Sequence, residues 1–280
     1  MIRRYYATKD NTITNAFEEN LVTRGTGSNM GASDILETFT IYGQASSASV
    51  ELTRFLIEFD TTQISSDRTA SNIPDSGSVS FFLKLYNAPH SQTTPSDFDL
   101  TISAVSQSWE EGYGLDMDYY EDITRDGIGS NWINAASGTT WTSQGGDYHA
   151  SPTFTAEFDT GLEDLEVDVT SLVEEWLDGT KDNYGFGIKL ADAFETTNRS
   201  FFRKKFFGRD SEFYFARPVI EARWNSSRKD DRGNFYASSS LAPASDNLNT
   251  LYLYNSIRGR LRDIPTLGSN DIYVDLYDSI

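Results

Sequence analysis

Short runs in which apolar and polar residues alternate recur along most of the chain. A period of two is typical of strands that bury one face. The runs lie at residues 3–7, 34–42, 52–59, 79–86, 98–105, 165–169, 184–190, 200–207, 212–215 and 219–224. In one of them Phe98, Leu100 and Ile102 alternate with acidic and hydroxyl side chains. The pattern predicts an all-β domain.

A single helix is predicted, at about residues 170–178. Ser171 and Glu174 have the spacing of a capping box, in which each side chain satisfies the other residue's free backbone N–H. Gly179 follows at a common terminating position. The apolar residues of this segment make one narrow face: Leu172, Val173, Trp176 and Leu177. A helix this short needs that face packed on a sheet.

The alternation weakens between residues 107 and 164, a region rich in glycine, acids and aromatics. This region is predicted to form long loops with short strands, held in place by Trp109, Trp132 and Trp141. Irregular stretches of this length inside a domain are uncommon and often functional. Residues 60–75 are likewise predicted to form a loop.

The chain is predicted to divide near residue 225. Residues 1–224 form a first domain, the polar residues 225–233 a linker, and residues 234–280 a β-rich extension or the start of a second β-domain. The last segment is too short to bury a core by itself, so we expect it to pack on the first domain or on another chain. The candidates for such an interface are the apolar residues of its final alternating run, Ile272, Val274 and Leu276.

The amino-acid composition excludes several kinds of site and several classes of binding partner. The 280 residues include 42 acids and 23 bases, for a net charge of −19, with no cysteine and two histidines. Disulfides and thiolate metal sites are therefore excluded, and nucleic acid and membrane surfaces are not expected as partners. No apolar run is long enough for a membrane-spanning helix, and the N-terminus does not resemble a signal peptide. We expect the chain to fold in the cytoplasm where it is made.

Acidic residues are concentrated between residues 110 and 126, which raises the question of calcium binding. The candidate ligands are Asp116, Asp118 and Asp122. An EF-hand register that starts at Asp116 fails, because its sixth position is Glu121 and its twelfth is Gly127. The alternative is a solvated acidic loop, and no other cofactor is expected.

Three aromatic residues of the irregular region are candidates for binding: Trp132, Trp141 and Tyr148. Such rings suit stacking on a sugar, burial in a protein interface, or anchoring of the loops. Carboxylate pairs such as Glu166 and Asp168 have a spacing that a glycosidase uses, but a chain with 42 acids contains such pairs by chance. We therefore expect no catalytic site.

A series of motifs carries a resemblance to a known family. They are ATKDNTI at 7–13, NMGASD at 29–34, RFLIEFD at 54–60, WEEG at 109–112, DVTSLVEEWLDG at 168–179, GFGI at 185–188 and ARPVIEA at 216–222. In order and spacing they resemble the DNRLRE domain family across about residues 5–224, and the motif at 168–179 is the most specific. The long insertion between Trp109 and Trp141 departs from the family pattern, and the residues after Trp224 lie outside it.

The resemblance implies a jelly-roll β-sandwich related to carbohydrate-binding modules, with no catalytic residues to carry over. The first residues of the chain resemble structural proteins of marine tailed phages, notably those that infect cyanobacteria. We therefore expect a non-enzymatic structural protein of a tailed phage virion (capsid decoration, neck or tail component), assembled in the host bacterial cytoplasm. Its expected partners are other virion proteins and copies of itself. The alternatives are an adhesin that binds host glycans, and an accessory module of a polysaccharide lyase or hydrolase.

Overall fold

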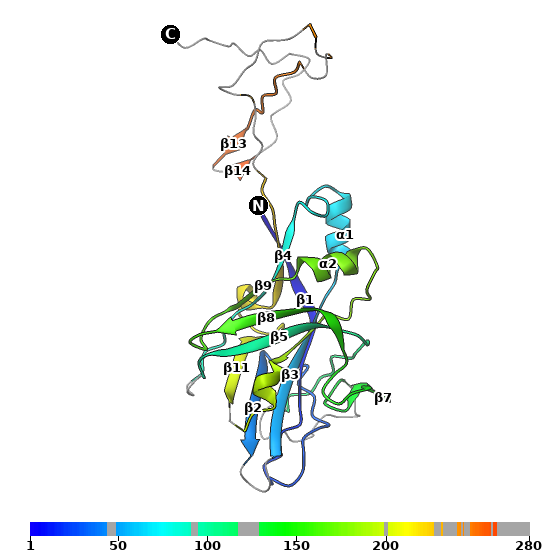
Figure 1. Cartoon of the computed structure of the whole chain (residues 1–280), viewed down its shortest axis with the longest axis vertical. Coiled ribbons are helices and arrows are strands. Elements are labelled where there is room, and N and C mark those ends of the chain that lie inside the picture. Colours follow the sequence, from blue (N-terminus) through cyan, green and yellow to red (C-terminus); the bar gives the residue numbers. More distant parts are fainter. Residues whose placement is uncertain are drawn as a thin grey trace. The chain divides into compact units, whose positions relative to one another are not determined.

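A computed structural model describes residues 1–43, 49–90, 95–116, 129–198 and 201–226, together with residue 231 and short stretches between 240 and 261. Contacts divide the chain into two units, Met1–Asn225 and Ser226–Ile280. This division lies beside the polar segment 225–233. The first unit is mainly β, with a few short helices, and Figure 1 labels most of its elements.

The strands and helices of the first unit follow most of the predicted pattern. The strands are β1 (Ile2–Thr14), β2 (Ile35–Gly43), β3 (Ser49–Phe59), β4 (Ser80–Leu85), β5 (Phe98–Val105), β6 (Asn134–Ala136), β7 (Thr139–Thr140), β8 (Tyr148–Phe158), β9 (Leu165–Asp168), β10 (Phe186–Leu190), β11 (Phe201–Phe207) and β12 (Val219–Arg223). The helices are α1 (Thr62–Thr69), α2 (Thr170–Leu177) and α3 (Asp192–Glu195), with the 3₁₀ turn η2 (Tyr214–Ala216). The predicted strands are confirmed except at residues 212–215, where η2 takes their place.

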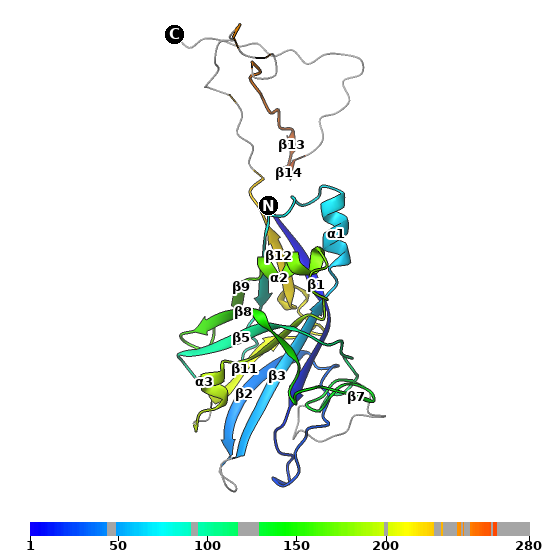
Figure 2. The ribbon, with the colours of Figure 1, turned by 45° about the vertical axis from the view of Figure 1, so that its right-hand side comes forward.

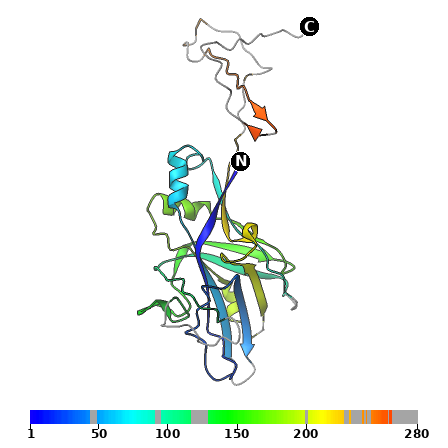
Figure 3. The same cartoon turned by 180° about the vertical axis from the view of Figure 1, so that it is seen from behind.

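The strand β1 connects two halves of one large antiparallel sheet. Its residues 2–6 pair with β12, and its residues 7–14 pair with β3, with a shift in register between Ala7 and Lys9. The strand order is β8-β5-β10-β3-β1-β12-β4-β9, while β2 joins β3 to β11. Figure 3 shows β1, in blue, running down the first unit.

The sheet is nearly closed into a barrel-like shape (Figure 2). Beyond the end of β4, the Ala88 N–H donates to the carbonyl of Lys205 in β11, and the Phe207 N–H donates to the carbonyl of Tyr86, each at 3.0 Å. These two bonds complete a ring that runs through β4, β12, β1, β3, β2 and β11. Such closure leaves few unpaired strand edges.

The main core lies between the inner faces of this curved sheet. In β3, Phe55, Ile57 and Phe59 point into it, whereas Leu56 belongs to a separate cluster on the outer face. In β5, Phe98, Leu100 and Ile102 are buried in the core, as the alternation predicts. Burying side chains of this size stabilises the fold by about 1.5–3 kcal/mol each.

The helix predicted near residue 170 is confirmed as α2, but the prediction that it stands alone is wrong. In α1 only Ile64 and Asp67 are buried, so α1 carries no apolar stripe that periodicity could reveal. The Asp67 carboxylate accepts the Tyr5 hydroxyl at 2.9 Å and pairs with Arg3, and both partners lie in β1. These contacts hold α1 against β1 where a loop is predicted.

The predicted capping box of α2 is also wrong. The helix begins at Thr170, one residue before Ser171, and its N-cap residue, Val169, makes no side-chain capping hydrogen bond. Instead, Asp168 accepts both the backbone N–H and the hydroxyl of Thr170, at 2.9 and 2.5 Å. The Glu174 carboxylate forms a bidentate pair with Arg68 of α1, which ties the two helices together.

The strand β8 overturns part of the prediction for residues 107–164. It spans eleven residues and pairs with β5 from Phe98↔Phe158 to Val105↔Tyr148. Only Ala156 and Phe158 of β8 are buried, which is why its alternation is weak in the sequence. The remaining described residues of this region form loops with the short strands β6 and β7, as predicted.

In the second unit, the described residues include the two-residue strands β13 (Ser256–Ile257) and β14 (Arg260–Leu261). The interface candidates Ile272, Val274 and Leu276 lie outside the described residues. Their role stays a prediction. Among the helices that the structure describes, none has the length and apolar character needed to cross a membrane.

Candidate functional site

The outer face of β3 is covered by loops of the irregular region, and a second hydrophobic cluster lies there. It consists of Ile13, Leu56, Val105, Trp109, Trp132, Ala135 and Trp141. Trp132 and Trp141 are each 5% exposed. The indole N–H of Trp109 donates to the carbonyl of Tyr184 at 2.9 Å, and that of Trp141 donates to the carbonyl of Asn131 at 2.8 Å. The tryptophans therefore anchor the loops, and their buried rings offer no open surface on which a sugar could stack.

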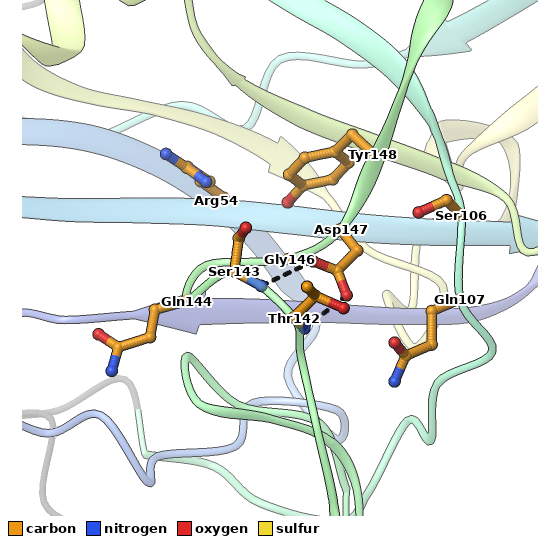
Figure 4. Close-up of a pocket in the computed structure, with 9 residues that line it drawn as sticks. All are labelled: Arg54, Ser106, Gln107, Thr142, Ser143, Gln144, Gly146, Asp147 and Tyr148. Carbon is orange, nitrogen blue, oxygen red and sulfur yellow. Dashed lines mark hydrogen bonds between the residues drawn. The ribbon is translucent and has the colours of Figure 1, made fainter.

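A cleft of about 660 Å³ lies at the edge of this cluster (Figure 4). It is lined by Arg54, Ser106, Gln107, Thr142, Ser143, Gln144, Gly146, Asp147 and Tyr148. Of the three aromatic candidates predicted from the sequence, Tyr148 lines this cleft. Most of the other lining side chains carry hydroxyl or amide groups, which act as both donors and acceptors.

The loop before β8 is held in one conformation by its own polar contacts. The Asp147 carboxylate accepts the backbone N–H groups of Thr142 and Ser143 at 2.7 and 2.8 Å (Figure 4). Gly145 and Gly146 have φ angles of +87° and +104°, which favour glycine. At Gly146 a Cβ would also collide with the Tyr148 ring. The lining of the cleft is therefore preorganised.

Arg54 of β3 lies at the side of the cleft with its charge neutralised. Its guanidinium makes two hydrogen bonds to the Glu195 carboxylate, at 2.9 and 2.7 Å, and a third to the carbonyl of Gly145 at 3.0 Å. The same group lies 5.1 Å from the centre of the Trp132 ring, in a cation–π contact. The side chains of Arg54 and Glu195 are 13% and 7% exposed. The two residues are distant in the sequence, and no local signal there links them.

The cleft suits a neutral ligand with many hydroxyl groups. Burial raises the pKa of Tyr148 to about 12, so its phenol stays protonated, and its hydroxyl donates to the carbonyl of Gly145 at 2.7 Å. Asp147 is the one carboxylate in the described lining, and both of its oxygens accept backbone N–H groups. Acid–base hydrolysis of a glycoside uses two carboxylates about 5–10 Å apart. The described lining provides one such carboxylate.

A second group of polar residues anchors the loop after Trp109. Asp10 of β1 is 1% exposed, and its carboxylate accepts the backbone N–H of Arg209 at 2.5 Å. The Asp10 N–H donates to the Glu111 carboxylate at 2.8 Å, and Arg209 pairs with the same carboxylate at 3.0 Å. Burial raises the pKa of Asp10 to about 7 against the opposing effect of the Arg209 N–H. Asp10 is therefore a buried acid that is protonated more readily than usual.

The calcium candidates are only partly covered by the structure. Asp116 is buried, and its carboxylate accepts the backbone N–H of Asn29 at 3.3 Å. Asp118 and Asp122 lie outside the described residues. Within the described ranges, no group of three or more acids or histidines has the arrangement of a metal site. Calcium binding by the acidic loop therefore stays a prediction.

A group of aromatic rings, three of them more than half exposed, lies beside β1 and β12. We call it the aromatic face, and it consists of Tyr6, Phe207, Phe213, Tyr214 and Phe215. Phe213, Tyr214 and Phe215 are 57%, 51% and 74% exposed. The rings of Tyr6 and Tyr214 lie 4.7 Å apart, and those of Phe207 and Phe213 lie 5.4 Å apart. Figure 3 shows the η2 turn, in gold, beside β1.

The turn that carries the aromatic face is wrongly predicted as a strand. Three consecutive aromatic residues have high strand propensity. The chain turns here because the Ala216 N–H donates to the carbonyl of Phe213 at 2.8 Å, and the Arg217 guanidinium donates to the carbonyl of Ser211 at 2.8 Å. As a result the aromatic rings point away from the core.

A set of paired charges continues the aromatic face along the outer side of β1, β12, β4 and β9. We call it the charged ladder, and it consists of Arg4, Lys84, Glu166, Glu221 and Arg223. Arg223 pairs with Glu166 at 2.5 Å and with Glu221 at 2.6 Å. Glu221 also pairs with Arg4 at 2.8 Å. The hydrogen bonds and charges of Arg223 and, to a smaller extent, of Lys84 lower the pKa of Glu166 to about 2. The ladder therefore stays charged across neutral and mildly acidic pH.

Comparison of the chain with protein-family models gives no match, and comparison with curated protein sequences gives none either. The resemblance to the DNRLRE family therefore stays a hypothesis carried by the sequence motifs. Among the described residues, the cleft at Tyr148 and the aromatic face each suggest a function.

Proposed function

We propose that the protein is a non-catalytic structural protein of a tailed phage virion and that it works by binding other proteins. The observation that carries this proposal is the aromatic face. Phe213, Tyr214 and Phe215 stand more than half exposed on a nearly closed sheet. Exposed apolar surface costs about 25 cal/mol per Å², and contiguous patches of it mark interaction sites.

The aromatic face is rigid before any partner arrives. Its turn is held by the bonds of Ala216 and Arg217, and the Phe213 N–H donates to the Ser211 hydroxyl at 3.2 Å. A preorganised surface loses little conformational entropy on binding. Tyr, Phe and Arg are also the residue types that protein interfaces favour. These features support binding to a protein.

The virion setting rests on the family resemblance. We assign the barrel-like sheet to the jelly-roll class that the resemblance implies, and its antiparallel strands with non-consecutive neighbours support this assignment. The expected partners are other virion proteins and copies of the chain, assembled in the bacterial cytoplasm. The net charge of −19 disfavours nucleic acid as a partner.

The test is the copy number of the protein in purified particles of a phage that carries the gene. Quantitative mass spectrometry should find the wild-type chain at a fixed ratio to the major capsid protein. The double variant Phe213→Ser, Phe215→Ser should fall at least about 10-fold in that ratio, because its interface loses two aromatic anchors. The control Leu162→Ser alters a side chain that is also exposed and should leave the ratio unchanged.

Two outcomes would contradict this proposal. Absence of the wild-type chain from particles would remove the virion role. Normal incorporation of the double variant would show that the aromatic face is not the surface that binds.

The second candidate function is recognition of a host glycan in the cleft, and the observation that favours it is the neutral, hydroxyl- and amide-rich lining around Tyr148. A glycan array should then show binding that falls at least about 10-fold in Gln144→Ala, which removes an exposed amide. Thr139→Ala, at an exposed residue that does not line the cleft, is the control. If no glycan binds, this candidate fails, and with it an accessory role for the cleft on a polysaccharide lyase or hydrolase.

A further inference from the structure

The aromatic face and the charged ladder form one continuous surface. Tyr6 contacts Tyr214 of the turn, and it lies on β1 two residues from Arg4 of the ladder. On the same side of the sheet, the Arg223 guanidinium lies 4.2 Å from the centre of the Phe82 ring. The surface thus combines exposed rings with charges that are already paired.

The local charge of this surface differs from that of the whole chain. Its bases are Arg4, Lys84, Arg217 and Arg223, and the acids on its strands are Glu166, Asp168 and Glu221. Bases and acids nearly balance here, whereas the chain as a whole carries −19. Two copies that meet elsewhere bring like charges together, which opposes association. On this surface that repulsion is reduced.

We infer that the aromatic face and the charged ladder bind a second copy of this chain. This inference rests on the proposed function of protein binding and names the partner. A basic partner would bind more strongly on the acidic remainder of the chain. A second copy carries the same acidic remainder, so the repulsion between two copies is reduced when both present this balanced surface. A second copy meets the balanced surface with the same balanced surface, as the two-fold contacts of homodimers require.

The test is the self-association of the purified full-length chain, measured by sedimentation equilibrium over about 1–300 μM protein in about 50 and 500 mM NaCl. We expect a dimer whose dissociation constant decreases at high salt, because salt screens the net charge of the two copies. A dimer whose dissociation constant increases at high salt would be held chiefly by ion pairs between the copies, which would contradict a contact through this surface.

The variants locate the contact. Phe215→Asp should weaken dimerisation at least about 30-fold, because it removes an exposed ring and adds an acid to the balanced surface. Its thermal unfolding should match the wild type, since the Phe215 side chain is largely in water. Tyr113→Asp makes the same kind of change at a residue that is 79% exposed elsewhere, and it should alter dimerisation less than about 3-fold.

Two further results would overturn the inference. The first is a wild-type chain that stays monomeric at every concentration and salt. The second is a dimer that survives Phe215→Asp but is lost in Leu253→Asp, which would assign the contact to the second unit. In either case the proposed function stands if the Phe213→Ser, Phe215→Ser variant is still lost from particles.

Discussion

The first unit holds two groups of aromatic residues that the sequence does not distinguish and that the fold treats in opposite ways. Trp109, Trp132 and Trp141 lie buried between the loops and β3. Phe213 and Phe215 stand in water beside β1 and β12. Both groups contain rings that contact other rings or cations, so ring contacts do not explain the difference. The degree of burial separates the aromatic residues that hold the fold together from those that remain available to a partner.

The difference between the two groups arises from the length and course of the segments that carry them. The loop that carries Trp132 folds back over β3, and its backbone groups find partners in other loop residues. The Trp132 N–H donates to the carbonyl of Thr26, and the Gly145 N–H donates to that of Trp132. The η2 turn is only three residues long and leads directly into β12. It has no loop that could fold back over its own rings.

The strongest test of this comparison removes one ring from each group. Trp132→Ala should lower the free energy of unfolding by about 3–5 kcal/mol, because it leaves a cavity beneath the loop. Phe215→Ala should change it by less than about 0.5 kcal/mol, because that side chain is 74% exposed. Urea unfolding of both variants measures the two values. Equal losses would mean that Phe215 is buried in the folded protein.

The second test removes the charged anchor beside Trp132. Arg54→Met should lower the free energy of unfolding by about 3 kcal/mol, because it leaves the Glu195 carboxylate buried without its bidentate partner. The double variant Arg54→Met, Glu195→Leu should recover most of the loss, since no buried charge remains. Urea unfolding in a double-mutant cycle gives the coupling energy. A double variant as unstable as the single one would show that packing, not charge, is lost.

The third test uses the pH dependence of Asp10, which anchors the loop after Trp109. The pKa of this carboxyl is near 3.8 in the unfolded chain and about 7 in the folded protein. The folded state binds the proton more tightly, so the free energy of unfolding falls as pH rises from about 4 to about 7. The total decline from this group is at most about 4 kcal/mol. Asp10→Asn should remove most of it when unfolding is measured at about pH 5 and 8.

The size of that decline identifies its source. The Asn side chain keeps an oxygen that can accept the Arg209 N–H, so the variant can retain the local structure. If the variant shows the wild-type decline, other groups titrate in this range and the pKa of Asp10 is not raised.

The smallest change in stability is expected for the charged ladder, which lies beside the exposed aromatic face. Glu166→Gln removes partners of Arg223 and Lys84 but should cost less than about 1 kcal/mol, because the Glu166 side chain is 42% exposed and water replaces the lost pairs. The folded-state pKa of Glu166 is lowered to about 2, so its contribution is present at neutral pH and is lost as pH falls toward 2. Thermal unfolding at neutral pH is the measurement. A larger cost would mean that the ladder stabilises the sheet itself.

Much of the candidate site could not be predicted from the sequence, for reasons that particular residues show. Tyr148 could be named as a candidate because it lies in the irregular region rich in glycine, acids and aromatics. Its partners could not, because Arg54 comes from β3 and Glu195 from α3, and only the packing of the sheet brings them together. Trp132 could be named as well, but its burial depends on a loop whose course no periodicity describes.

The β-rich class, most of the strands and the α2 helix could be predicted from the sequence, because alternation and helical spacing are local properties of the chain. The tertiary structure decided the rest. It placed α1 where no apolar stripe exists, since Asp67 finds its partners on β1. It also closed the sheet through bonds between residues 86–88 and β11, and it turned the strand predicted at 212–215 into an exposed aromatic face. These outcomes depend on contacts between residues far apart in the chain, which no local pattern encodes.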